Sequence, residues 1–245
     1  MSVEASGRDS ALVKRIEVEH VVRVFDEVAA VYDRGRSGWY RGILELLEGR
    51  VSPPLLDAGC GTGLIASRLA LKGLDCVVCL EASRSMLKIA WRRALRWGVG
   101  GFIHPVRAML PMLPLRSSSF RSAVALAVIH HVYGRSRRVR ALRELLRVVK
   151  EGTIVVTVWS LLTPENLARY LGEGLSRDVI VPWRRGGRAL TRYYHLYTPG
   201  ELREDLEAAG FREYRVYAWD YRKRVFKRNL VAEAQVGRSR VARPS

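Results

Sequence analysis

Apolar residues follow two alternating patterns along this chain. Short, almost continuous apolar runs predict buried strands at residues 55–58, 75–81, 102–106, 122–129 and 153–159. Stretches with apolar residues at helical spacing predict helices at residues 16–32, 40–48, 64–71, 84–96, 136–149 and 199–209. Strands that alternate with helices of this length are typical of an α/β fold with a parallel, doubly wound sheet.

Several residues mark where these elements begin and end. Ser83 is expected to cap the helix that follows it, because a serine oxygen can accept a free N–H of the first turn. Gly152 is expected to end the helix at 136–149, and residues 211–221 and 224–234 predict a closing hairpin. Residues 160–198 form a polar and aromatic insertion that breaks the alternation.

These patterns predict one main domain, over residues 15–236, that includes the insertion 160–198. Residues 1–14 are polar and weakly patterned, so we expect a flexible N-terminus. Residues 237–245 form a basic tail.

The first strand leads into a turn with the sequence Asp57-Ala58-Gly59-Cys60-Gly61-Thr62-Gly63. Glycine allows the backbone positive φ and a close approach to a ligand. The spacing Gly-x-Gly-x-Gly differs from the dinucleotide fingerprint, whose third glycine comes one residue later. Glu81 ends the next strand, where one carboxylate can accept hydrogen bonds from both hydroxyls of a ribose. A purely structural glycine turn with an exposed Glu81 is the alternative interpretation.

The charge balance indicates a polyanionic partner. The chain has 42 Lys and Arg against 24 Asp and Glu, a formal net charge of +18. Nucleic acid is the first candidate, because basic proteins gain affinity by releasing counterions from a phosphate backbone. An arginine-rich surface that reflects genome composition or thermal adaptation is the alternative.

Cysteine content and hydropathy indicate a cytoplasmic protein without a membrane segment. Three cysteines and no visible secretory signal are typical of a reducing compartment. Cys76 and Cys79 have the spacing of metal ligands, but no second ligand pair follows, so we interpret them as core residues and predict no metal. The apolar run at 123–129 is far too short to span a bilayer.

Two further stretches carry candidate chemistry. The fourth strand leads through Ala127 to His130 and His131, and ligands of open α/β sheets bind outside such strand ends. We expect one histidine to shape the cofactor pocket and the other to face the substrate, with a structural role as the alternative for each. The insertion interleaves arginines with aromatic residues, a pattern that suits unstacked bases and includes Trp183, Arg185, Arg192, Tyr194 and His195. The rings could instead attach the insertion to the core.

The glycine turn resembles the first motif of the class I S-adenosylmethionine-dependent methyltransferases. More specifically, the chain resembles the methyltransferases that esterify a carboxymethyl group on the wobble uridine of tRNA, including the methyltransferase domain of AlkB-homologue fusion enzymes. The matching segments are residues 25–32 with Arg36 and Trp39, the turn 57–63, residues 129–131, 178–183, 192–197 and 200–205. The resemblance implies a Rossmann-like fold with seven strands, mostly parallel, an antiparallel last strand and helices on both faces.

The resemblance also implies roles for particular residues. Arg36 and His131 would hold the carboxymethyluridine, or a related modified base, at the catalytic centre. S-adenosyl-L-methionine would be bound by Asp57, Gly59, Cys60, Gly61, Gly63, Glu81, Met109, Ala127 and His130. The anticodon loop would contact Arg36, Trp39, Trp183, Arg185, Arg192, Tyr194 and His195. Met109 departs from the family pattern, in which an acidic residue holds the adenine amino group.

By the same resemblance we expect a small zinc-binding activator protein as a partner. The strand at 102–106 is a plausible edge for it, with Trp91 and Trp97 nearby. Two other functions remain open at this point. One is a small-molecule methyltransferase of the quinone or lipid-precursor type, and the other is a non-catalytic RNA-binding member of the family.

Overall fold

The computed structural model describes residues 18–34, 36–185, 188–222 and 227–237, without the side chains of 18–20, 183–185 and 188–189. The predicted flexible N-terminus, residues 1–14, lies outside the described residues, as does the basic tail apart from Gly237. Among the described residues, no helix combines the length and the apolar character needed to cross a bilayer.

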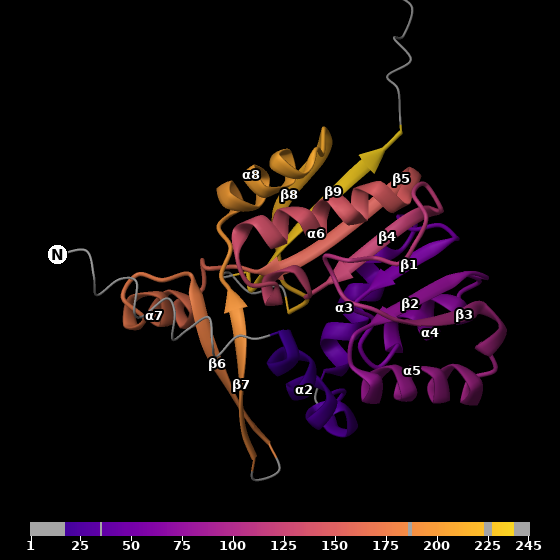
Figure 1. Cartoon of the computed structure of the whole chain (residues 1–245), viewed down its shortest axis with the longest axis horizontal. Helices are drawn as coiled ribbons and strands as arrows, with labels where there is room; N and C mark the ends of the chain where they lie inside the picture. Colours follow the sequence, from indigo (N-terminus) through magenta and orange to yellow (C-terminus); the bar gives the residue numbers. More distant parts are fainter. Residues whose placement is uncertain (1–17, 35, 186–187, 223–226, 238–245) are drawn as a thin grey trace, which may run out of the picture.

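The central element is a seven-stranded sheet in the order β3-β2-β1-β4-β5-β9-β8 (Figure 1). Its strands are β1 (Leu55–Ala58), β2 (Val77–Glu81), β3 (Ile103–Arg107), β4 (Phe120–Leu126), β5 (Val149–Trp159), β8 (Glu213–Trp219) and β9 (Asn229–Val236). Neighbours from β3 to β5 pair in parallel, and β9 pairs antiparallel with both β5 and β8. The last strand in the chain is therefore the antiparallel one among the described strands, which confirms the predicted fold.

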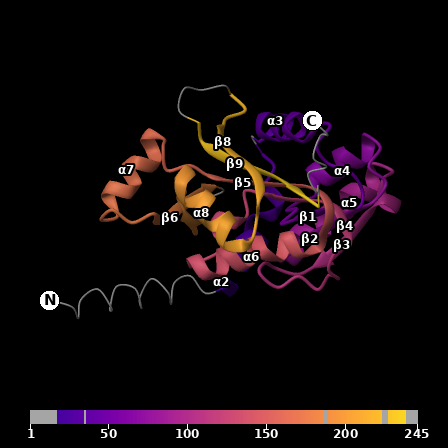
Figure 2. The ribbon, with the colours of Figure 1, turned by 90° about the horizontal axis from the view of Figure 1, so that it is seen from above.

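Side chains of successive strand residues point to opposite faces of the sheet, as the pleat requires. Leu56 and Ala58 join one apolar cluster with α6 (Arg135–Val148) and α8 (Pro199–Ala209). Leu55, on the other face, joins a second cluster with helices from the first half of the chain. Those helices are α3 (Ser37–Leu47), α4 (Leu64–Leu71) and α5 (Arg84–Arg96). In Figure 2 the strands lie between α3 and α6, so the sheet is covered on both faces.

Polar residues cap the starts of α5 and α8. The Ser83 hydroxyl accepts the N–H of Met86 at 3.1 Å, which confirms the predicted cap of α5. Thr198 caps α8 in the same way, accepting the Glu201 N–H at 3.2 Å, and Gly210 ends that helix with φ of +104°. These caps hold the helix starts at the carboxyl edge of the sheet, where the candidate site lies.

Two predicted boundaries are wrong. The fourth strand ends at Leu126, and residues 129–131 form a short 3₁₀ helix, η3 (Ile129–His131). Gly152 does not end α6, because β5 already begins at Val149 and runs through Gly152. The pairing of β4 with β5 shifts register between Phe120 and Ser122, and Gly152 meets this irregularity with φ of +138°.

The described part of the chain starts with α2 (Val18–Val28) and the short η1 (Ala29–Val31), so the predicted first helix ends earlier than expected. The insertion forms α7 (Pro164–Gly172) and a separate two-stranded sheet of β6 (Asp178–Arg185) and β7 (Arg188–His195). Figure 1 shows α7 and this hairpin projecting from the end of the sheet domain. The two ends of the insertion meet, because the Leu161 N–H donates to the Tyr197 carbonyl at 2.8 Å and the Tyr197 N–H to the Trp159 carbonyl at 3.0 Å.

The backbone at Gly152 yields a test of the β4–β5 irregularity. A Cβ there would lie 2.0 Å from the Arg121 carbonyl oxygen, so Gly152→Ala requires the sheet to shift. We expect a loss of on the order of 3 kcal/mol or more in unfolding free energy, measured by chemical denaturation. Gly73→Ala is the matched control, since Gly73 also has positive φ but nothing lies within 4 Å of its Cβ. The control is expected to cost only the backbone strain, about 1–2 kcal/mol, and equal losses for both variants would contradict this explanation.

Candidate active site

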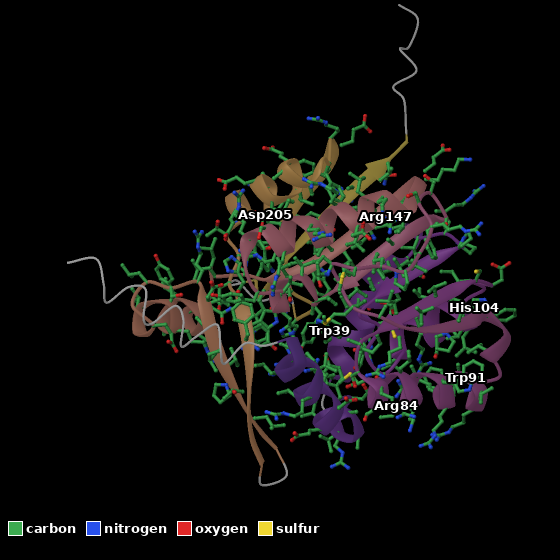
Figure 3. All side chains as sticks on the ribbon, in the orientation of Figure 1. Trp39, Arg84, Trp91, His104, Arg147 and Asp205 are labelled. Atoms are coloured by element: carbon green, nitrogen blue, oxygen red, sulfur yellow. The ribbon has the colours of Figure 1, made fainter. Side chains whose placement is uncertain are left out.

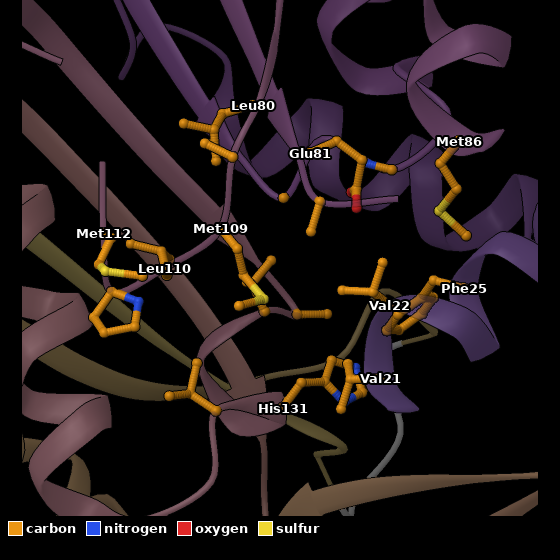
Figure 4. A pocket seen from close by; sticks show the side chains of 18 of the residues that line it. Val21, Val22, Phe25, Leu80, Glu81, Met86, Met109, Leu110, Met112 and His131 are labelled. Carbon is orange, nitrogen blue, oxygen red and sulfur yellow. The ribbon is translucent and has the colours of Figure 1, made fainter. Parts of the chain in front are cut away.

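A cavity of about 400 Å³ opens at the carboxyl ends of β1, β2 and β4. Figure 4 shows Glu81 on one side of it and His131 on the other, with Met109 between them and Met86 on the side of Glu81. Val21, Val22 and Phe25 of α2 form an apolar part of the remaining wall, and Arg137 and Arg140 of α6 also line the cavity. We call this space the donor cavity.

The glycine turn forms the floor of the donor cavity. Gly59 and Gly61 line it and have φ of +81° and +56°. A Cβ on Gly59 would lie 2.4 Å from the Val128 side chain, so only glycine fits there. A Cβ on Gly61 would meet nothing closer than 3.8 Å, which leaves room above the turn for a bound molecule.

Glu81 ties this turn to the end of β2. One carboxylate oxygen accepts the Gly61 N–H at 2.9 Å, and the other accepts the Ser83 N–H at 2.8 Å. Burial raises the pKa of Glu81, while these backbone hydrogen bonds act in the opposite direction. Each oxygen keeps acceptor capacity, so the carboxylate can still bind two hydroxyls of a ribose.

The other predicted donor residues divide into two groups. Met109 and Ala127 line the donor cavity, whereas Asp57, Cys60 and Gly63 are not among its lining residues. Asp57 is buried beneath the turn, where burial and the nearby Glu81 raise its pKa to about 7. Gly63 serves packing, since its Cβ would lie 2.6 Å from that of Ala90 on α5.

Two aspartates that the sequence analysis missed attach the N-terminal segment to this turn. Asp26 on α2 accepts hydrogen bonds from the Ser83 hydroxyl and the Ser85 N–H, both at 2.7 Å. Asp33 accepts from the Tyr40 and Thr62 hydroxyls, each at 2.6 Å, and pairs with Arg93 at 2.5 Å. No spacing in the sequence links these residues to the glycine turn, because their partners other than Tyr40 lie 29 to 60 residues away.

A second cavity of about 310 Å³ adjoins the first, and we call it the acceptor cavity. It is lined by four arginines from separate segments, namely Arg36, Arg169, Arg192 and Arg228. Aromatic rings surround them, from Tyr32, Trp39, Trp159, Tyr194 and Tyr221. Tyr32, Ala127 and His131 line both cavities. A cationic, aromatic pocket therefore meets the donor cavity at these three residues.

The two histidines occupy different places. His131 Nδ1 lies 2.9 Å from the Tyr193 carbonyl oxygen, which can only accept, so Nδ1 carries the proton. Burial, with Arg192 and Arg36 nearby, lowers the pKa of His131 to about 3, so the ring is neutral and Nε2 is an acceptor. His130 does not line the donor cavity as predicted but the acceptor cavity. Its Nδ1 accepts the Trp159 N–H at 3.2 Å, and its ring stacks on Tyr194.

Ala127 forms the boundary between the cavities in an uncommon backbone conformation. Its φ is +59°, and its N–H donates to the Thr157 carbonyl at 3.0 Å and lies 2.9 Å from the Thr157 hydroxyl. Strain of this kind in a residue other than glycine is frequent at functional sites. The sequence marks Ala127 only by its position after a strand.

The predicted RNA-binding residues are distributed unevenly. Arg36, Trp39, Arg192 and Tyr194 line the acceptor cavity. Trp183 and Arg185 lie on β6, and their side chains are outside the described part of the chain. His195 is buried and lines neither cavity, contrary to the prediction. The sequence analysis missed Arg169, Asn166 and Arg228, because nothing in their spacing sets them apart from other polar surface residues.

His195 belongs to a buried ionic cluster at the base of the insertion. Its Nδ1 lies 2.6 Å from Asp178, and its Nε2 lies 2.9 Å from Glu201 on α8. Since carboxylates accept, both ring nitrogens carry protons. Burial disfavours the charged ring, but the hydrogen bonds to Asp178 and Glu201 outweigh it and raise the pKa of His195. This cluster joins the hairpin to the main domain. Within the described residues, no group of three or more His, Cys, Asp or Glu is arranged to hold a metal ion.

Comparison with known proteins agrees with this geometry. Residues 56–157 match the family model described as a methyltransferase domain. A tRNA (carboxymethyluridine(34)-5-O)-methyltransferase of Schizosaccharomyces pombe is 28% identical over 79% of this chain and 89% of its own. A protein of Encephalitozoon cuniculi named only as a methyltransferase is 32% identical over 80% of this chain and 89% of its own. The structure of a SAM-dependent methyltransferase from Methanosarcina mazei has a TM-score of 0.64 and 24% identity, covering 79% of this chain and 95% of that one.

The strand order, the glycine turn and the acid that ends β2 define a nucleotide-binding α/β domain of the methyltransferase type. Together with its relatives, this assigns the chain: it belongs to the class I S-adenosylmethionine-dependent methyltransferases. The donor cavity fits that cofactor, because its open glycine turn, buried carboxylate and apolar walls suit a nucleoside with a sulfonium side chain.

The ionic cluster predicts a pH dependence of stability. The pKa of His195 is raised in the folded protein, so its contribution is fully present below the unfolded pKa, near 6.5, and is lost as the pH rises through the folded pKa. We expect His195→Gln to lower the thermal midpoint at pH below about 6.5 and to have a smaller effect in alkaline buffer. Thermal unfolding followed by circular dichroism measures this. His104→Gln, at an exposed histidine on β3, is the control, and a deficit that grows with pH would contradict the charged state of His195.

Proposed function

We propose that this methyltransferase esterifies the carboxymethyl group of a modified wobble uridine in tRNA. The observation that carries the proposal is the meeting of the donor cavity with an acceptor cavity rich in arginine and aromatic residues. The names of relatives such as the Schizosaccharomyces pombe enzyme support the same substrate. A net charge of +18 favours an RNA partner, since binding to phosphates dominates affinity for nucleic acids.

The acceptor cavity suits a splayed nucleoside that carries an anion. Aromatic rings can stack on an unpaired base, and guanidinium groups can bind a carboxylate with two parallel hydrogen bonds. We assign the anion to Arg36 and Arg192, which come from distant parts of the sequence, before β1 and on β7. Tyr32 lies under Arg36, whose guanidinium carbon is 3.9 Å from the ring centroid, so this arginine is oriented before a ligand arrives.

The reaction needs little acid–base chemistry from the protein. S-adenosylmethionine supplies an activated methyl group when it is bound. A carboxylate is ionised at neutral pH, so the nucleophile needs no general base. The protein therefore has to bind the anion, exclude water and align it with the donor across the boundary at Ala127. A neutral His131 fits this scheme, since its Nε2 can accept a hydrogen bond from the base or ribose but does not supply charge for the anion.

The two competing functions are less well supported. A neutral quinone or lipid precursor brings no anion to the acceptor cavity, where four lining arginines outnumber the one lining glutamate, Glu165, and desolvating this excess of positive charge would be costly. A non-catalytic RNA-binding member would not need the bond between Glu81 and Gly61 at the floor of the donor cavity. Met109 remains a departure from the family, and its side chain can pack on adenine without accepting a hydrogen bond.

We also propose a small zinc-binding activator protein as partner, seated at the β3 edge of the sheet. β3 is an outermost strand, so it can add a strand from another chain. Beside it lie exposed apolar side chains, with Trp91 38%, Leu95 56% and Phe102 42% exposed. Trp97 is instead packed against the core, beside Arg68, and is not part of this surface. With three free cysteines, the cytosol is the compartment in which we expect the enzyme to act.

Two substitutions separate acceptor binding from donor binding. Arg36→Gln is expected to lower kcat/KM on carboxymethyl-modified tRNA by about 10- to 100-fold, with unchanged S-adenosylmethionine affinity, because it removes a charge-assisted hydrogen bond to the anion. Glu81→Gln is expected to weaken donor binding by a similar factor. Mass spectrometry of wobble nucleosides measures the product, and calorimetry measures the donor.

Arg34→Gln is the control for Arg36, since Arg34 is exposed two residues away and lines neither cavity. If Arg36→Gln weakened donor binding and acceptor binding equally, Arg36 would not have the proposed role of binding the acceptor anion. Absence of any wobble product from the wild type, with its activator present, would overturn the proposed function.

The partner has its own test. The chain purified alone is expected to self-associate, because the apolar surface beside β3 is uncovered. Light scattering after gel filtration should show less association for Leu95→Gln/Phe102→Gln. A chain that is monodisperse and fully active alone would rule the activator out.

A further inference from the structure

The outer side of α5 carries a regular row of four cations, which we call the α5 row: Arg84, Lys88, Arg92 and Arg96. All four are exposed, and the helix contains no acidic residue. None of the four forms an ion pair with another described residue of the chain. Figure 3 shows the nitrogen-bearing side chains of α5, Arg84 among them, on the side of the helix that faces away from the sheet.

This row is unfavourable for the isolated protein. Like charges four residues apart on a helix repel each other and destabilise it. Some surface arginines elsewhere in the chain have acidic partners, such as Arg147 with Glu144 and Arg215 with Glu233. A row without acidic neighbours is therefore better explained by an external polyanion than by stability. Each step of four residues rises about 6 Å along the axis, so the cations form a ladder about 18 Å long.

The α5 row starts at the site and leads away from it. Arg84 directly follows Ser83, which caps α5 and donates a hydrogen bond to Asp26. Ser83 itself lies two residues after Glu81, which lines the donor cavity. Further along the helix, Arg93 pairs with Asp33, three residues before Arg36 of the acceptor cavity. The row is thus held next to the segment that carries Arg36.

We propose that the RNA strand flanking the acceptor nucleotide runs along α5, with its phosphates bound by the α5 row. The inference rests on the proposed function for the identity of the acceptor. A polynucleotide fits better than an acidic protein surface, because the cations repeat at one constant step and α5 is paired with the segment that carries Arg36 of the acceptor cavity. The row thus adds a binding surface that the two cavities do not contain.

The test measures the salt dependence of RNA binding. The probe is a fluorescent anticodon stem-loop, followed by anisotropy over a range of salt concentrations. The slope of log K against log salt should become shallower by about 0.7 for each phosphate of a single strand that the protein no longer binds. For Lys88→Gln/Arg92→Gln we expect a slope smaller by about 1.4 and, at about 0.15 M salt, an affinity about 14-fold weaker. The thermal midpoint should not fall, because the substitution relieves repulsion and glutamine favours helices.

Arg121→Gln/Arg212→Gln is the matched control. It removes the same charge at exposed positions near the amino ends of β4 and β8. These strand ends lie on the side of the sheet opposite to the carboxyl ends, where the two cavities open. The control should leave both slope and affinity close to those of the wild type. An unchanged slope in Lys88→Gln/Arg92→Gln, or an equal change in the control, would overturn the inference.

Two further readouts separate the possible failures. If polyglutamate binding falls in the α5 variant while RNA binding is unchanged, the row serves an acidic protein and our inference is wrong. Methyl transfer to a carboxymethyluridine-containing trinucleotide should be nearly the same in the variant and the wild type, because the trinucleotide is too short to follow α5. If neither the wild type nor the variant methylates any RNA, the proposed function fails. The anisotropy measurement would still show whether the α5 row binds RNA phosphates.

Discussion

The buried carboxylate of Glu81 is the constraint around which the site is arranged. It binds the N–H groups of Gly61 and Ser83, and thereby fixes the glycine turn after β1 against the start of α5. Ser83 in turn caps α5 and binds Asp26 of α2. One acid thus determines the floor of the donor cavity, the direction of α5 and the position of the helix that covers the cavity. A side chain so placed is hard to replace, because each of its oxygens already serves a backbone group.

The two cavities are built from different kinds of structural element. The donor cavity consists mainly of strand ends and the turns after them, whose geometry the sheet fixes. The acceptor cavity draws its arginines from four separate segments: the loop before α3, α7, β7 and the segment before β9. The shape of the donor cavity therefore depends on the packing of the core, and the shape of the acceptor cavity depends on how peripheral segments pack against one another. His131 belongs to both, and its bond to the Tyr193 carbonyl links the sheet domain to the hairpin.

The sequence predicted the parts of the structure that local pattern controls. Apolar runs and helical spacing suffice for the sheet and its helices, and the turn 57–63 with Glu81 suffices for the donor site. Gly152 misled the prediction, because a glycine with positive φ serves a sheet irregularity as well as a helix end. His195 misled it in another way, since a histidine among arginines and tyrosines reads as exposed, yet Asp178 and Glu201 hold it inside. Arg169 and Arg228 carried no signal, because only the tertiary fold brings them to the acceptor cavity.

The adjacent ends of the insertion have a consequence for how such enzymes diversify. The hydrogen bonds between Leu161, Tyr197 and Trp159 join the two ends of the insertion where it leaves the sheet domain. The length and sequence of the insertion can therefore change without altering the register of β5. A lineage could exchange this module for another and acquire a new methyl acceptor, while the machinery that handles the methyl donor stayed intact. The same junction is a suitable position at which to graft a different insertion onto the sheet domain.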